Sequence, residues 1–175
     1  TEALPAYAQP LFVRVLSATG QSLGTGTYNP RGSIAVRLLA REDVTLDATF
    51  VRRRVADAYA LRESLGIVRD NTAYRLLHGE GDWLPGVIAD VYGGFVVIQI
   101  LTAGAERLRP AILAALQEVV DPEGIFERSA GGARREEGGL LQALGQEALG
   151  EVAREDQHAG ARGRVEGPAE VQVHA

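Results

Sequence analysis

The feature that most constrains the fold is a pair of short apolar segments joined by a glycine turn. Residues 86–91 and 95–100 are rich in Val and Ile, and a Tyr-Gly-Gly turn separates them. Such a pair is typical of a β-hairpin. A strand is predicted before it at 73–78, and a helix over about 105–120 and a further strand at 124–128 are predicted after it. This order predicts an α+β domain in which helices cover one sheet.

The first 45 residues predict short strands separated by turns. Residues 11–16, 23–28 and 33–39 are strand-like, and an Asn-Pro-Arg-Gly turn at 29–32 separates the last two. Apolar residues alternate in the third segment and are expected on one face, with Arg37 on the other. They are Ile34, Val36 and Leu38. Three short strands at this spacing predict part of a small β-barrel.

A helix is expected between these two regions, with Asp47 as its N-cap and Gly66 near its C-terminus. A stripe at helical spacing is expected to face inward. It consists of Val51, Val55, Ala58, Arg62 and Leu65. Arg52 and Arg53 point away from this stripe and Arg54 flanks it. The three arginines are therefore either a solvated helix face or a patch that contacts phosphates.

Charge is unevenly distributed along the 175 residues. Residues 1–75 hold 10 Arg against 7 acids, a net charge of +3, and residues 76–175 hold 8 Arg against 16 acids, a net charge of −8. All 18 basic residues are Arg. Guanidinium groups are thus the only side-chain cations, apart from protonated His, that can meet phosphate. The asymmetry hints at a nucleic-acid-facing N-terminal part.

Several classes of protein are excluded by what the sequence lacks. There is no Cys, so no disulfide scaffold, thiolate metal site or cysteine nucleophile is expected. The three His are widely spaced, which disfavours a zinc site. No run approaches the roughly 18 apolar residues of a membrane helix. Without a secretory signal, we expect a cytoplasmic protein.

Three segments of the sequence carry recognisable motifs. They are Tyr28-Asn29-Pro30-Arg31, the run from Ala73 to Gly93 that includes His78-Gly79-Glu80-Gly81-Asp82-Trp83, and Ile125-Phe126-Glu127-Arg128-Ser129. Together they resemble the motifs of bacterial S-adenosylmethionine (SAM)-dependent 23S rRNA cytosine-C5 methyltransferases, which carry an N-terminal PUA domain, a central α+β (EEHEE) domain and a C-terminal Rossmann-like catalytic domain. The resemblance covers roughly residues 10–138.

The resemblance implies a domain organisation and a partner. Residues 1–45 would form a partial PUA-like β domain, 46–150 the central α+β domain, and 151–175 a linker toward a catalytic domain that this chain lacks. The partner would be RNA, 23S rRNA by resemblance, and SAM would bind in the missing domain. The chain also departs from the family: a first PUA strand is missing, and Ala130 stands where the family's Glu-Arg-Ser-Asp motif has an acid.

Chemistry limits what these residues can do alone. Cytosine C5 is a poor nucleophile, and such enzymes activate it by adding a cysteine thiolate to C6, which this chain cannot do. Gly24-x-Gly26 lacks a third glycine and leads to a proline turn, so it predicts no nucleotide site. We therefore expect no catalytic residue, no cofactor and no metal in this chain. Whether the protein counts as an enzyme stays open, because full-length family members are methyltransferases.

Four arginines are predicted to contact RNA: Arg31, Arg37, Arg52 and Arg53. The alternative for the first two is turn hydrogen bonding or solubility. His78, Glu80 and Asp82 lie within five residues, but a turn whose carboxylates accept backbone N–H bonds explains them better than a catalytic or metal cluster. Trp83, the one Trp, is predicted to anchor a core or interface rather than to stack on a base.

These observations favour an RNA-binding or RNA-positioning portion of a methyltransferase-like protein. A second hypothesis is a stand-alone interaction module that pairs with a partner or forms a homodimer, because an incomplete barrel leaves strand edges unpaired. A small hydrolase that uses Glu80 and Asp82 is the least supported alternative.

Overall fold

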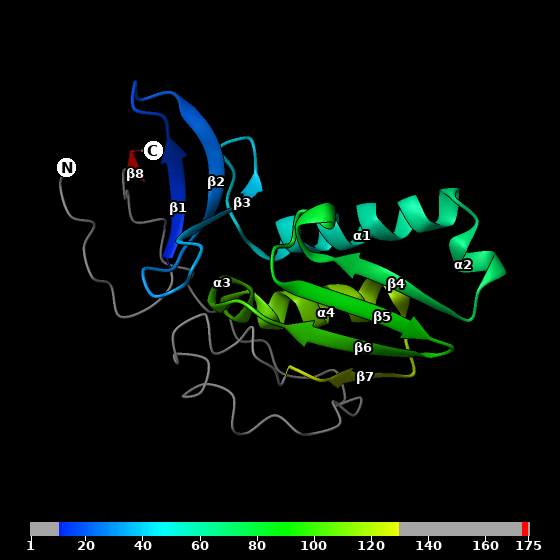
Figure 1. Ribbon diagram of the computed structural model, residues 1–175. Coiled ribbons are helices and arrows are strands. Elements are labelled where there is room, and N and C mark those ends of the chain that lie inside the picture. The colour runs from blue at the N-terminus through cyan, green and yellow to red at the C-terminus, as the bar shows by residue number, and fades with distance from the viewer. Residues whose placement is uncertain (1–10, 130–172, 175) are drawn as a thin grey trace.

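The computed structural model describes residues 11–129 and 173–174, which form two four-stranded sheets and a set of helices (Figure 1). The α+β class is confirmed. The predictions for 130–172, including most of the linker and part of the central domain, lie outside the described residues. Within the described part, no helix is long and apolar enough to cross a membrane.

The N-terminal sheet has the strand order β3-β2-β1-β8. Its strands are β1 (Leu11–Leu16), β2 (Ser22–Tyr28), β3 (Val36–Ala40) and β8 (Val173–His174). The first three run antiparallel, and β8 lies parallel to β1 with Val15 opposite Val173. Residues far apart in the chain thus share one sheet (Figure 1).

The predicted alternation around β3 is wrong. Ile34 precedes the strand and is exposed, and Leu38 is exposed as well, whereas Leu39 and Ala40 are buried. A β-bulge explains why Leu39 and Ala40 both face inward: Thr25 pairs with Ala40 and Gly26 with Leu38, so Leu39 has no partner. An extra residue shifts every following side chain to the other face of a sheet.

The first long helix, α1 (Ala48–Ser64), begins as predicted. The Asp47 carboxylate accepts a hydrogen bond from the Phe50 N–H at 2.8 Å, which satisfies one of the unpaired donors of the first turn. Gly66 follows the helix with φ 75°, a left-handed conformation that glycine adopts at little cost. A short helix, α2 (Ile67–Asp70), was not predicted.

The central sheet has the strand order β4-β5-β6-β7. Its strands are β4 (Ala73–His78), β5 (Val87–Tyr92), β6 (Phe95–Ile100) and β7 (Gly124–Glu127). The 3₁₀ turn η1 (Gly79–Asp82) follows β4, and α3 (Ala103–Arg107) and α4 (Arg109–Val120) connect β6 to β7. The hairpin is confirmed, and β7 runs parallel to β6.

The helix predicted over 105–120 is two helices that meet at Leu108. Pro110 explains the break, because it has no N–H to donate to the carbonyl of Glu106 and its ring crowds that carbonyl. Proline is tolerated in the first turn of α4, where N–H groups have no helical partner.

One face of the central sheet is covered and the other is not. Helices α1 and α4 pack on the same side of the sheet (Figure 1). The side chains between them are almost fully buried and include Val51, Val55, Leu76, Ile98, Ile112 and Leu116. Among the described residues, no helix lies on the opposite face.

Candidate nucleic-acid interface

The two sheets meet at a junction built from β2, β3, α1, α3 and η1. Leu39 and Ala40 at the end of β3 belong to the same buried cluster as the central domain's core. Gly104 of α3 packs on Thr27 of β2 so closely that an added Cβ would lie 2.5 Å from the Thr27 hydroxyl oxygen. The described parts of the two regions therefore share packed side chains.

Trp83 lies at this junction between two guanidinium groups. The Cζ atom of Arg41 is 5.8 Å from the Trp83 ring centroid, and that of Arg54 is 5.6 Å from it. Arg54 also donates from Nη2 to the carbonyl oxygen of Leu39 at 3.1 Å. These contacts favour the predicted role of Trp83 as an anchor, with cation–π attraction as the added force.

Arg53 and Arg54 crowd one another on α1. Their Cζ atoms lie 6.0 and 4.9 Å from the centroid of the same Phe50 ring. Burial, and next the positive charge of Arg53, lower the pKa of Arg54, while Asp57 and Glu42 act in the opposite direction. An arginine stays protonated despite such a shift, so the result is concentrated positive charge.

The Nε of Arg54 is buried and has no hydrogen-bond partner among the described residues. We call Arg41, Arg53 and Arg54 the junction arginines. Arg41 and Arg53 are exposed, so an anion can reach both of them from solvent. A phosphate there would face guanidinium groups that carry no ion pair within the described part of the chain.

The four predicted arginines occupy different places. Arg53 lies at the junction, and Arg37 reaches it through an ion pair of 3.1 Å with Glu80 of η1. Arg31 is exposed in the β2–β3 turn, where its backbone N–H donates to the Asn29 side chain at 3.1 Å. Arg52 instead forms an ion pair of 2.6 Å with Glu118 of α4.

Sequence reasoning missed Arg41 as a site residue, and it considered Arg54 as part of a possible phosphate-contacting patch without including it among the four arginines predicted to contact RNA. Neither has a signal in the sequence beyond its charge, because the bulge at Leu39 and the turn at η1 bring them to Trp83. Arg62 was also missed as a partner of the acidic turn. An arginine on an apolar helix stripe is the signal that could have identified it, since a buried cation needs a buried anion.

The acidic turn η1 contains a hydrogen bond from a backbone N–H to a carboxylate, as predicted. Asp82 accepts a hydrogen bond from the His78 backbone N–H at 2.6 Å and a two-pronged ion pair from Arg62, whose Nη2 lies 2.9 Å from Oδ2. The Arg62 and Asp82 side chains are only 12% and 6% exposed. Among the described residues, no group of three or more His, Asp or Glu side chains is placed to hold a metal ion.

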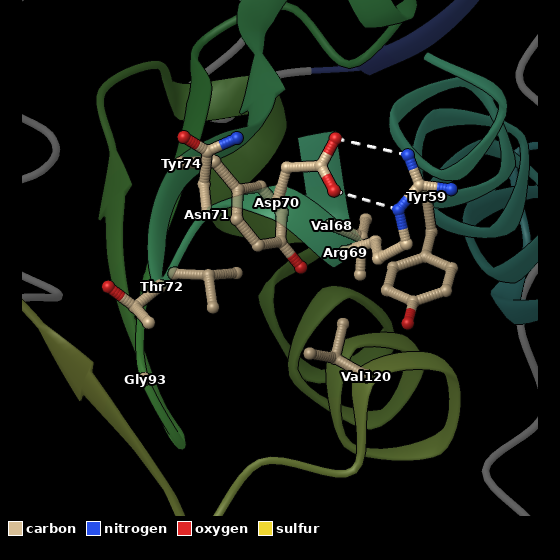
Figure 2. A pocket seen from close by; sticks show the side chains of 10 residues that line it. Tyr59, Val68, Arg69, Asp70, Asn71, Thr72, Tyr74, Gly93 and Val120 are labelled. Carbon is tan, nitrogen blue, oxygen red and sulfur yellow. Dashed lines mark hydrogen bonds and ion pairs between the residues drawn. The ribbon is translucent and has the colours of Figure 1, made fainter. Parts of the chain in front are cut away.

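A pocket of about 450 Å³ opens near the α2–β4 connection (Figure 2). Its apolar walls are formed by Val68, Val91 and Val120, and the rings of Tyr59 and Tyr74 also line it. An exposed ion pair between Arg69 and Asp70, 2.7 Å long, lies at its rim and lowers the pKa of that carboxyl. These groups can contact an apolar ring or a hydrogen-bonding edge, but they contain no paired nucleophile and base.

Parts of the sequence are similar to proteins of known families. A family model described as a PUA-like domain matches residues 3–41. Ribosomal RNA large subunit methyltransferase I of Pseudoalteromonas atlantica is 39% identical over 131 residues, which are 74% of this chain and 33% of that protein. The enzyme of the same name from Erwinia tasmaniensis is 38% identical over 128 residues, 72% of this chain and 32% of its own. This chain resembles part of an rRNA methyltransferase.

Two solved structures of methyltransferase candidates are also similar to this chain. A SAM-dependent methyltransferase candidate from Streptococcus mutans matches with a TM-score of 0.63 and 26% identity, over 73% of this chain and 34% of its own. The methyltransferase candidate SMU.776, crystallised with SAH, matches with a TM-score of 0.61 and 26% identity, over 67% of this chain and 31% of its own. The chain spans about a third of the length of the curated relatives it matches.

The described residues do not fit SAM. The β6–α3–α4–β7 crossover is the one parallel strand–helix–strand unit that they contain, and a nucleotide-type site there would need a glycine-rich turn after β6. The turn, Leu101-Thr102, has no glycine, and Gly104 in the first turn of α3 is already covered by Thr27. The carboxylate of Glu127 at the end of β7 is bound by Arg109 and by the Ser129 hydroxyl.

Proposed function

We propose that this chain is an RNA-binding and RNA-positioning portion of an rRNA methyltransferase-like protein. In this proposal residues 1–45 form the PUA-like part, 46–150 the central α+β domain and 151–175 a linker. The RNA is 23S rRNA, the modified base is cytosine at C5, and the protein acts in the cytoplasm. Methyl transfer itself belongs to a catalytic domain outside this chain.

The observation that carries the proposal is the cluster of junction arginines. Three guanidinium groups from two elements gather around the Trp83 and Phe50 rings, and two of them are open to solvent. Arg31 and Arg37 extend the positive charge along the N-terminal sheet. Arginine suits such a site, because its fork of donors matches phosphate oxygens.

The non-catalytic part of the proposal rests on the residues present. The sequence has no Cys to add to C6 of a cytosine. The only parallel crossover in the described part has its turn closed by Thr27 and its acid engaged by Arg109. We expect calorimetry to detect no binding of SAM to this chain, and tight SAM binding would contradict the proposal.

RNA binding is tested through its salt dependence. We expect a structured rRNA fragment to bind more weakly as salt rises, because arginines that contact phosphates release counterions. Replacing two junction arginines in Arg41→Gln/Arg53→Gln is expected to reduce the slope of log K against log salt by about 1.5 to 2. Arg52→Gln is the matched control, because Arg52 is held by Glu118. A slope that the double variant leaves unchanged would refute the site.

A further inference from the structure

The face of the central sheet opposite α1 and α4 carries an ordered set of side chains. The strand register places Tyr92 opposite Phe95 in one cross-strand row. In the next row Asp90 stands opposite Val97, which in turn stands opposite Phe126. Side chains two apart on a strand share a face, so these residues face away from the helices. We call this the uncovered face.

Three aromatic rings of the uncovered face are open to solvent. Tyr92 is 54% exposed, Phe95 42% and Phe126 43%. The Phe95 and Phe126 rings are tilted by 54°, with centroids 5.8 Å apart. Gly124 lies opposite Phe95, where an added Cβ would be in ordinary contact with the Phe95 ring at 3.4 Å.

Polar and charged groups surround these rings. Arg75 forms a two-pronged ion pair with Asp90, with distances of 2.8 and 3.0 Å. Arg128, one residue beyond β7, is exposed and forms no ion pair with the described residues. Gln99 and His78 lie one row further along, each opposite Ile88. Asp90 already pairs with Arg75, and the Glu123 carboxylate lies beside Gly94 at the end of the hairpin. Arg128 is therefore the exposed cation next to these rings that an anionic ligand can reach.

We propose that the uncovered face binds unpaired bases of single-stranded RNA by stacking them on Phe95, Phe126 and Tyr92. The inference rests on the proposed RNA-binding function and adds a second, chemically distinct site to it. Exposed rings on neighbouring strands of an open sheet offer flat surfaces to successive bases. Arg75 and Arg128 lie where the phosphates between those bases would run, and Gln99 can hydrogen-bond a base edge.

The alternative occupant is a protein surface, either a second copy of this chain or another domain. A protein interface of this kind is expected to be apolar at its centre and depleted of charge. Here the row that contains Val97 and Phe126 also holds the Arg75–Asp90 pair, so the centre of the face is charged. This mixture favours RNA over a second copy.

The test compares single-stranded RNA with duplex RNA. A labelled uridine oligomer and a labelled RNA duplex of equal length are titrated with the full chain and with the variant Phe95→Ala/Phe126→Ala. We expect the variant to lose about tenfold or more in affinity for the single strand, the scale of losing one stacked base, and little for the duplex. Leu61→Ala removes an equally exposed apolar side chain from α1 and is the matched control.

The outcomes separate this inference from the proposed function. The inference is supported if Arg41→Gln/Arg53→Gln lowers the affinity for both RNAs while the phenylalanine variant lowers the affinity for the single strand alone. Unchanged single-strand affinity in the phenylalanine variant overturns it and leaves the proposed function standing. No binding of either RNA by the unaltered chain overturns both.

A second measurement does not depend on how the variants fold. Ultraviolet crosslinking of the uridine oligomer to the unaltered chain is expected to mark peptides that contain Phe95 or Phe126. Crosslinks confined to the junction around Trp83 would overturn the inference. A homodimer in sedimentation that the phenylalanine variant dissociates, together with unchanged single-strand affinity, would assign the face to a second copy.

Discussion

The N-terminal sheet and the central domain differ sharply in how much core each has. The buried cluster within the N-terminal sheet consists of Val13, Val15 and Tyr28, with Val36 packed against it. The cluster of the central domain joins α1, α4 and all four strands of its sheet, and it also takes in Leu39 and Ala40 from β3. A cluster of three buried residues removes little apolar surface from water, and such burial is the main favourable term in folding. We therefore expect the described N-terminal sheet to depend on its neighbour for stability.

The largest effect is expected from the central core. Leu116→Ala empties a fully buried position between α4 and the sheet, and we expect it to lower the free energy of unfolding by about 2–5 kcal/mol. Both regions should then lose protection from hydrogen exchange together, because the N-terminal sheet packs against this core through Leu39 and Ala40. Val13→Ala is the counterpart in the small cluster and should raise exchange in β1–β3 while leaving β5 and β6 protected. Equal exchange throughout in both variants would contradict the comparison.

A smaller effect is expected where the two regions touch. Gly104→Ala places a methyl group 2.5 Å from the Thr27 hydroxyl oxygen and close to its Cβ, atoms that cannot swing aside. We expect a loss of about 1–3 kcal/mol, typical of overpacking. Fluorescence of Trp83, the one Trp in the sequence, should change as the junction opens. Gly81→Ala is the control, because Gly81 is also not at positive φ and an added Cβ there would meet only His78 Cδ2 at 3.8 Å, an ordinary contact. An unchanged spectrum and stability for Gly104→Ala would show that the regions are not tightly packed.

The smallest expected effect is on the pH dependence of stability, and it arises from Tyr74 in the central domain. Burial, followed by the nearby Tyr59 and Glu63, raises the pKa of the Tyr74 phenol above its ordinary value. The unfolded chain therefore ionises first as pH rises through about 10, so this group's contribution to stability is present below that pH and is lost above it. Tyr74→Phe should flatten the loss of stability in urea unfolding between about pH 9 and about pH 11. A loss of stability over this range that is as steep in Tyr74→Phe as in the unaltered chain would refute the assignment.

Local signals in the sequence predicted much of the fold. Asp47 is the N-cap of α1 because a short carboxylate reaches the N–H groups of the first turn, a contact that depends on neighbouring residues only. The hairpin around Gly93 follows from turn chemistry in the same way. The break at Leu108 was not predicted: Pro110 was expected to be tolerated near the start of one helix, and instead it lies in the first turn of a second helix.

The site was less predictable because it depends on contacts between distant segments. The bulge at Leu39 turns both Leu39 and Ala40 inward, and strand pairing rather than local pattern creates it. The contacts of Arg41 and Arg54 with Trp83 join three segments that are distant in the chain. Of the predicted arginines, Arg52 pairs with Glu118, 66 positions away, which no local pattern predicts.

The bond from Arg54 to the Leu39 carbonyl has a mechanical consequence. The same guanidinium lies against Phe50 of its own helix and against Trp83, so one side chain contacts both the end of β3 and the central domain. An anion that drew this group outward would have to displace it from the carbonyl. Anion binding at Arg54 would then remove one of the polar contacts that join the two regions.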